Sequence, residues 1–260
     1  MIDLDGLKPY FPKEIRENSI YDKYILKEHI QLMILDFLST SIYVKPLVFI
    51  GGTSLRLVKG IDRFSEDLDF DCKRFSDTEF EAMTDDVLLF LRRCGLRAES
   101  KDKPNPRLTA FRRNIYFPEL LHEMGLSGHK EERFLIKIEA QDQGISYKPV
   151  MANIRRMGFF FPFPVPPDKT LCAMKLSALL SRGKGRDFYD TMFLLGLTEP
   201  DYGYLAEKAS VHDKAELKAA LLDTFDETDM KRRSQDFAHL RFRESGSDKI
   251  LRFREFVQSL

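Results

Sequence analysis

Three aspartates alternate with apolar residues in one short segment of this chain, and they are its most informative feature. Asp67, Asp69 and Asp71 are separated by Leu68 and Phe70. Successive side chains of a β-strand point to opposite faces, so the pattern places the three carboxylates together on one face. Paired carboxylates of this kind can hold one or two Mg²⁺ ions that bridge the phosphates of a nucleotide. The structural alternative is the solvent-exposed face of an edge strand.

A glycine turn precedes the aspartates. An apolar strand, residues 47–50, runs into Gly51, Gly52, Thr53 and Ser54. Glycines let a phosphate approach the backbone, and hydroxyl or N–H groups at a helix start can bind its oxygens. The segment lacks the Gly-Lys-Ser/Thr ending of a P-loop and the third glycine of a dinucleotide fingerprint. By itself, a pair of glycines is more often just a turn. Followed by the acidic segment, it favours phosphoryl or nucleotidyl transfer from a nucleoside triphosphate, because carboxylates along one strand face repel each other unless something neutralises them.

A third carboxylate usually completes such a metal site. Glu139 is our candidate, because it lies in a predicted strand, residues 134–140, and shares a face with Lys137. An exposed strand residue would show the same pattern.

Further charged residues lie in two predicted helices downstream. Lys175 is surrounded by apolar residues, and burying a lysine is costly without an anionic partner such as a phosphate. Arg186 is available for a phosphate or for a strand aspartate. Asp187 and Asp190 are spaced to share a helix face. As structural alternatives, Lys175 could extend to water and Asp187 could cap its helix.

The remaining pattern places these segments on a mixed α/β framework. We predict helices over residues 13–42, 78–94, 169–180 and 186–195, and strands over residues 47–50, 67–71 and 134–140, with further strand material in 96–117 around a turn at 104–106. The prolines at 162–167 indicate a joint. We therefore expect an α/β core with N-terminal helices over residues 1–160 and a helical domain over residues 161–260 that completes the active site.

The composition limits the cellular setting. The chain has 260 residues, of which 43% are apolar, so it can bury a sizeable core. Lysine plus arginine balance aspartate plus glutamate at 41 each, so the net charge indicates no partner. Three widely spaced cysteines fit a reducing cytosol. No apolar run reaches the roughly 20 residues of a membrane span, and the start lacks a signal peptide, so we expect a cytoplasmic protein. Basic residues gather in two segments, 92–113 and 231–254. Either segment could contact the backbone of a nucleic acid, or it could simply be a solvated face.

The order of these motifs resembles the AbiEii/AbiGii toxin family of nucleotidyltransferases. The resemblance rests on residues 49–55, 63–70 and 186–190 and on Lys175, and it extends from about residue 20 to about residue 197. It implies an α+β fold, with a polymerase-β-like nucleotidyltransferase core, a mixed sheet flanked by helices, and a helical C-terminal part.

The resemblance also implies roles for individual residues. Asp67 and Asp69 would bind metal, Gly52 with Thr53 or Ser54 would contact phosphate, Lys175 would contact the triphosphate, and Asp190 would be an essential acid. We add Gly51, Arg186 and Asp187 to the expected nucleotide-binding residues and Glu139 to the expected metal ligands.

Members of this family are toxins of bacterial type IV toxin–antitoxin or abortive-infection systems, and some transfer nucleotides to the acceptor end of transfer RNA. The resemblance therefore implies an enzyme that uses Mg²⁺ (or Mn²⁺) to transfer a nucleoside monophosphate from a nucleoside triphosphate to RNA, with a cognate antitoxin protein as partner. Two alternatives stay open, namely an enzyme that nucleotidylates or phosphorylates a partner protein, and a binding module without turnover.

Overall fold

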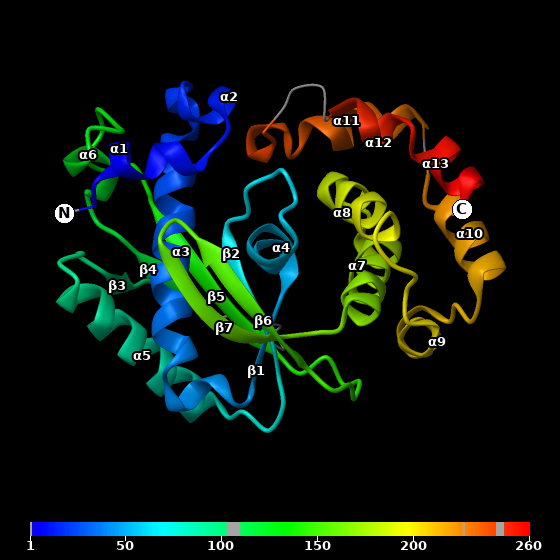
Figure 1. The fold of residues 1–260 in the computed structure, drawn as a ribbon, viewed down its shortest axis with the longest axis horizontal. Coiled ribbons are helices and arrows are strands. Elements are labelled where there is room, and N and C mark those ends of the chain that lie inside the picture. The colour runs from blue at the N-terminus through cyan, green and yellow to red at the C-terminus, as the bar shows by residue number, and fades with distance from the viewer. Residues whose placement is uncertain (1, 103–109, 226, 243–246) are drawn as a thin grey trace. The chain divides into compact units, whose positions relative to one another are not determined.

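A computed structural model describes residues 2–102, 110–225, 227–242 and 247–260 of the chain (Figure 1). The chain divides into two compact units. Unit 1 consists of Met1–Lys59, Phe64–Gly144 and Met151–Val165, and unit 2 consists of Gly60–Arg63, Ile145–Val150 and Pro166–Leu260. Each unit is made of three segments of the chain. The division into two continuous domains, residues 1–160 and 161–260, stays a prediction. In the described part of the chain, no helix is long and apolar enough to cross a membrane.

Unit 1 is built on a five-stranded mixed sheet in the order β1-β2-β5-β4-β3. Its strands are β1 (Leu47–Ile50), β2 (Asp67–Cys72), β3 (Glu99–Ser100), β4 (Phe111–Tyr116) and β5 (Leu135–Gln141). β2 pairs antiparallel with β1 and parallel with β5, and β4 pairs antiparallel with β5 and β3. The three strands predicted from hydrophobic patterning are confirmed within one residue at each end. The turn predicted at residues 104–106 lies outside the described residues.

Helices flank this sheet (Figure 1). They are α1 (Leu4–Leu7), α2 (Lys13–Arg16), α3 (Asp22–Ser39), α4 (Gly51–Ser54) with its π-helical continuation η4 (Leu55–Lys59), α5 (Asp77–Arg93) and α6 (Leu120–Glu123). Residues 13–42 are largely helical, as predicted, but they do not form one continuous helix. The chain breaks after α2 because the Asn18 side chain accepts the Ile20 N–H at 3.1 Å and starts a separate turn. α5 begins one residue before its predicted start, where Ser76 and Glu79 form a capping box.

The proline-rich segment, residues 162–167, includes the end of a strand, and the boundary between the two units falls within it, between Val165 and Pro166. β6 (Val150–Arg156) and β7 (Phe159–Val165) form a separate two-stranded sheet, which the sequence did not predict. Phe161 and Phe163 are buried, and Pro162 alternates with them on the exposed side. Proline is tolerated in a strand whose N–H group does not have to pair with a neighbour. The Phe163 ring lies 5.9 Å from those of Phe49 and Phe70 on the main sheet, so this strand covers the core of unit 1.

Unit 2 is helical. Its helices are α7 (Asp168–Arg182), α8 (Gly185–Leu195), α9 (Tyr202–Ala209), α10 (Lys214–Asp223), α11 (Glu227–Gln235), α12 (Ser247–Leu251) and α13 (Phe253–Ser259). The two predicted helices, 169–180 and 186–195, are confirmed. α7 ends at Gly183, which has a positive φ of +55° and so provides the left-handed cap that glycine favours.

A buried carboxylate connects three segments of unit 1. Glu28, in α3, is 2% exposed and accepts a hydrogen bond from Arg56 Nε at 2.9 Å and another from Arg156. Arg56 belongs to η4, directly after the glycine turn, and Arg156 belongs to β6. Burial raises the pKa of Glu28, and the charge of Arg156 opposes that rise. Glu28 therefore fixes the segment after the glycine turn to the longest helix of the unit.

We expect Glu28→Gln to lower the free energy of unfolding by about 3 kcal/mol, because it leaves two arginines without their anionic partner. The matched control is Glu17→Gln. Glu17 is 57% exposed and lies 3.9 Å from Lys13, and surface pairs of this kind contribute only about 0–1 kcal/mol. Urea unfolding of both variants is the measurement, and equal midpoints would contradict the assignment.

Candidate active site

The glycine turn packs directly against the acidic strand. Ile50, the last residue of β1, lies opposite Asp69 of β2. Gly51 follows with a φ of +80°, and a Cβ added there would lie 2.2 Å from Asp69 Oδ2. The carboxylate of Asp69 therefore occupies the space that a side chain at residue 51 would need. Glycine is required here both for its backbone conformation and for this close approach.

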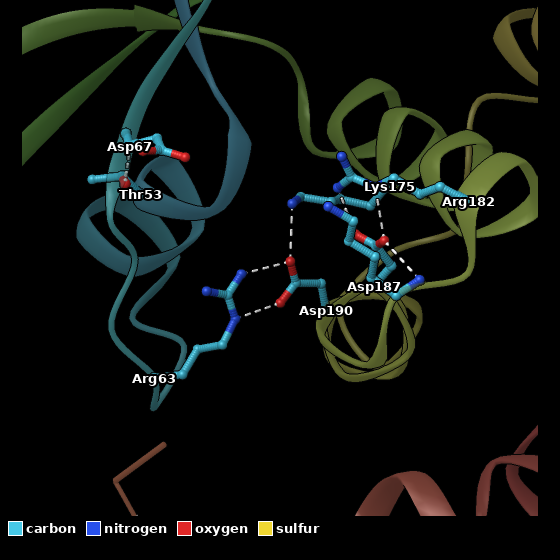
Figure 2. Close-up of polar contacts among 8 residues, drawn as sticks. Thr53, Arg63, Asp67, Lys175, Arg182, Asp187 and Asp190 are labelled. Atoms are coloured by element: carbon cyan, nitrogen blue, oxygen red, sulfur yellow. Dashed lines mark hydrogen bonds and ion pairs between the residues drawn. The ribbon is translucent and has the colours of Figure 1, made fainter. Parts of the chain in front are cut away.

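A hydroxyl holds the turn to the strand. Thr53 Oγ1 donates a hydrogen bond to the backbone carbonyl of Asp67 (Figure 2). Thr53 is 1% exposed and Ser54 is fully buried. No described residue offers a hydrogen-bond partner to the Ser54 hydroxyl. The structure thus brings the four predicted residues of the glycine turn beside the acidic strand, and it uses the Thr53 hydroxyl within the protein.

The predicted third carboxylate lies on the same sheet face. The parallel ladder sets Asp69 beside Glu139 and Asp67 beside Lys137. Lys137 Nζ lies 2.9 Å from Asp67 Oδ2 and 3.5 Å from Glu139 Oε1. Arg112, on β4, donates from Nε to Glu139. Lys137 and Arg112 therefore neutralise the carboxylates of Asp67 and Glu139 in this structure.

Lys137 is positively charged at neutral pH. Burial alone would lower the pKa of its ammonium group. The hydrogen bond to Asp67 and the charges of Asp67, Glu139 and Asp69 outweigh burial and raise that pKa above its usual value. Sequence reasoning noted only that Lys137 shares a face with Glu139; its position in the parallel ladder is what places it beside Asp67.

Asp71 has a different environment from the other two aspartates. It is 1% exposed, and its Oδ1 accepts the N–H of Gln143 at 2.9 Å. Asp71 thus fixes the chain just after β5.

The carboxylates suit a magnesium ion that arrives with a nucleotide. Within the described ranges, no group of three or more His, Cys, Asp and Glu side chains could hold a metal ion. Mg²⁺ usually keeps several waters and binds through one or two carboxylates plus substrate phosphates. Asp67 and Asp69 can supply these two carboxylates beside a glycine that has no side chain. Glu139 as a metal ligand stays a prediction, because Arg112 and Lys137 contact it.

Asp190, in α8 of unit 2, is fully buried between two cations (Figure 2). Arg63 donates to it from Nε at 2.7 Å and from Nη2 at 2.6 Å, and Lys175 Nζ lies 2.9 Å from its Oδ2. Burial alone would raise the pKa of Asp190, but Arg63 and Lys175 lower it to about 2. Asp190 is therefore the anionic partner that a lysine inside an apolar helix requires. Sequence reasoning quoted Arg63 only as part of a motif and did not find this pairing.

Asp187 fixes the turn between α7 and α8. It is fully buried and accepts hydrogen bonds from Arg182 Nε at 2.9 Å and Nη2 at 2.8 Å, as well as from the Lys184 N–H at 3.2 Å. These contacts match the capping role weighed for Asp187 in the sequence. Arg186 lies half-buried in the first turn of α8. A nucleotide contact by Asp187 or Arg186 stays a prediction.

The basic segments are partly used within their own units. Arg113 Nη2 lies 3.2 Å from Asp85 and its Nη1 lies 3.3 Å from Asp102. Arg241 is 6% exposed, so it is not part of a solvated basic face. A nucleic-acid contact by either segment stays a prediction.

A mixed sheet that carries two neighbouring aspartates beside a glycine turn can hold a divalent metal ion together with the phosphates of a nucleotide. A family model described as nucleotidyl transferase AbiEii toxin, type IV toxin–antitoxin system, matches residues 34–259. The chain therefore belongs to the AbiEii family of nucleotidyltransferase toxins, and the family predicted from its motifs is confirmed.

One solved structure supports the fold. MenT4, a nucleotidyltransferase toxin from Mycobacterium tuberculosis H37Rv, is similar over 100% of this chain and 91% of its own, with a TM-score of 0.60 and 16% identity. JHP933 from Helicobacter pylori is similar over 91% of this chain and 92% of its own, with a TM-score of 0.49 and 18% identity. No curated protein sequence matches the chain. The predicted α+β nucleotidyltransferase fold is confirmed.

We expect Gly51→Ala to abolish nucleotidyl transfer, because the new Cβ would displace the Asp69 carboxylate. The matched control is Gly95→Ala, at a φ of +85° with no atom within 4 Å of the added Cβ. Both variants should lose roughly 1 kcal/mol of stability or more from the left-handed backbone, but only Gly51→Ala should lose activity. The measurements are urea unfolding and consumption of labelled nucleoside triphosphate. Retained activity in Gly51→Ala would refute this role of the turn.

The pKa of Asp190 predicts a pH dependence of stability. The pKa of an aspartate in an unfolded chain is about 3.9, whereas the pKa of Asp190 in the folded protein is about 2. The stabilisation that ionised Asp190 provides is therefore complete above about pH 4, and it is lost as the pH falls through about 2. At neutral pH we expect Asp190→Asn to be less stable than the parent protein by about 3 kcal/mol. That difference should shrink between about pH 4 and pH 2.

Urea unfolding at several pH values in this window measures the difference. Asp223→Asn, at an exposed position of α10, serves as the control and should follow the parent protein throughout. A difference between Asp190→Asn and the parent protein that stays constant as the pH falls would contradict the assignment.

Proposed function

We propose that this chain is a magnesium-dependent nucleotidyltransferase that transfers a nucleoside monophosphate from a nucleoside triphosphate to the 3′ end of a transfer RNA. The observation that carries the proposal is the packing of the Asp69 carboxylate against Gly51. This contact brings the carboxylate that we assign to metal binding and the backbone of the glycine turn together within unit 1. The AbiEii family supports the role of a toxin opposed by a cognate antitoxin protein.

In unit 1, Asp67 and Asp69 hold Mg²⁺ or Mn²⁺. The metal, when bound, neutralises triphosphate charge and stabilises the attacking and leaving oxygens. We assign Gly51 and Gly52 to contacts between their backbone and phosphate oxygens, because neither has a side chain that would block the approach. Thr53, through its hydrogen bond to the Asp67 carbonyl, keeps the turn and the strand in register. A hydroxyl of the acceptor attacks the α-phosphate in line, and pyrophosphate leaves.

In unit 2, Lys175 contacts the triphosphate and stabilises the charge that develops on it. Asp190 is the essential acid that positions Lys175, since the two side chains form an ion pair at 2.9 Å. Arg63 holds Asp190 through two hydrogen bonds, which fixes the carboxylate in one orientation. We assign Arg186 and Asp187, in the first turn of the same helix, to the nucleotide-binding residues.

The test is incubation of the protein with each α-labelled nucleoside triphosphate, Mg²⁺ and total cellular RNA. We expect label in a band of transfer-RNA size and a loss of labelling of at least about 100-fold in Asp69→Ala, because a metal-binding carboxylate is removed. Asp77→Ala, at an exposed aspartate of α5, is the matched control and should label RNA normally.

The destination of the label separates the outcomes. Label on protein instead of RNA would refute the RNA acceptor and keep the nucleotidyltransferase. Equal labelling by Asp69→Ala and the parent protein would refute the site.

A further inference from the structure

Lys137 lies among the carboxylates that the proposed function assigns to metal binding. Its ammonium group is 2.9 Å from Asp67 and 3.5 Å from Glu139. The side chains of Lys137, Asp67 and Glu139 keep only 22–25% of their surface exposed. The position next to Asp67 is therefore occupied by a cation that belongs to the protein itself.

The sheet fixes this position. Lys137 is the direct neighbour of Asp67 in the parallel ladder between β2 and β5, and Asn114 of β4 lies on its other side. A shift of register would move the lysine to the other face of the sheet, where the buried Ile136 and Ile138 lie. The backbone of Lys137 must stay beside Asp67, and only its flexible side chain can leave.

A metal ion that binds Asp67 and the ammonium group of Lys137 are two cations that compete for the same carboxylate. The metal ion and the ammonium group would repel each other when both are bound to one carboxylate, and this repulsion is strong where water is partly excluded. A bound metal ion would therefore release the ammonium group from Asp67. The triphosphate that accompanies the metal carries several negative oxygens, and these offer the released lysine a new partner.

We propose that Lys137 is a nucleotide-binding residue that exchanges partners: it holds Asp67 in the free protein and contacts the triphosphate once a metal ion has taken Asp67. This inference rests on the proposed function, because it needs the metal site at Asp67. It implies that the protein binds a divalent metal weakly by itself and more tightly together with a triphosphate.

The first test is a Mn²⁺ titration of the full chain by calorimetry without nucleotide. Lys137→Met should bind Mn²⁺ on the order of tenfold more tightly than the parent protein, because the competing charge is gone. Lys137→Arg keeps the charge and should bind as weakly as the parent protein. Lys130→Met, at an exposed lysine of unit 1, is the control and should change nothing.

The second test uses inorganic triphosphate in saturating Mn²⁺, since this probe carries the phosphates of any nucleotide. Lys137→Met should bind it on the order of tenfold more weakly than the parent protein, because one phosphate contact is lost. Unchanged Mn²⁺ affinity or unchanged triphosphate affinity in Lys137→Met would each overturn the inference.

Asp67→Asn separates this inference from the proposed function. If Asp67→Asn binds Mn²⁺ as well as the parent protein does, the metal site itself is wrong and both fail. If Asp67→Asn loses Mn²⁺ binding and Lys137→Met behaves like the parent protein, only the role of Lys137 fails.

Discussion

Carboxylates of like charge can lie side by side on a sheet face only when cations lie between them. The parallel pairing of β2 with β5 puts Asp69 beside Glu139, and the same face carries Lys137 and Arg112. These two cations make the acidic face stable without a metal ion. The glycine turn depends on that face in turn, because Gly51 packs on the Asp69 carboxylate and Thr53 donates to the Asp67 backbone.

The carboxylates of unit 2 also need cationic partners, and they are more deeply buried than those on the sheet face. Asp187 and Asp190 are both fully buried on one helix, and each is held by an arginine of its own, Arg182 or Arg63, through two hydrogen bonds. Bidentate pairing compensates for the lost hydration better than a single contact would. Arg63 lies between the glycine turn and the acidic strand along the chain, and yet it belongs to unit 2. The motif that contains Asp67 and Asp69 thus also contains an arginine that holds a buried carboxylate of the helical unit.

The parts of the fold that rest on local patterning could be predicted from the sequence. Alternation of apolar and acidic residues is a property of the strand itself, so β2 and the shared face of Lys137 and Glu139 were predictable. The strand with Pro162 was not, because proline is tolerated there only where its position in the sheet requires no N–H donor. The partner of Lys175 was not predictable either. Its apolar surroundings showed that it needed an anion, but only the packing of α7 against α8 places Asp190 beside it.

The glycine turn shows why a hydroxyl next to two glycines need not touch a substrate. Thr53 is 1% exposed, and its hydroxyl already donates to the carbonyl of Asp67. Ser54 is fully buried as well. The group that this turn can offer to a phosphate is therefore mainly its backbone, and the missing side chain of Gly51 lets that backbone lie against the Asp69 carboxylate. Two residues of the turn thus hold it to the acidic strand in different ways: Thr53 donates its hydroxyl to the Asp67 carbonyl, and Gly51 leaves space for the Asp69 carboxylate.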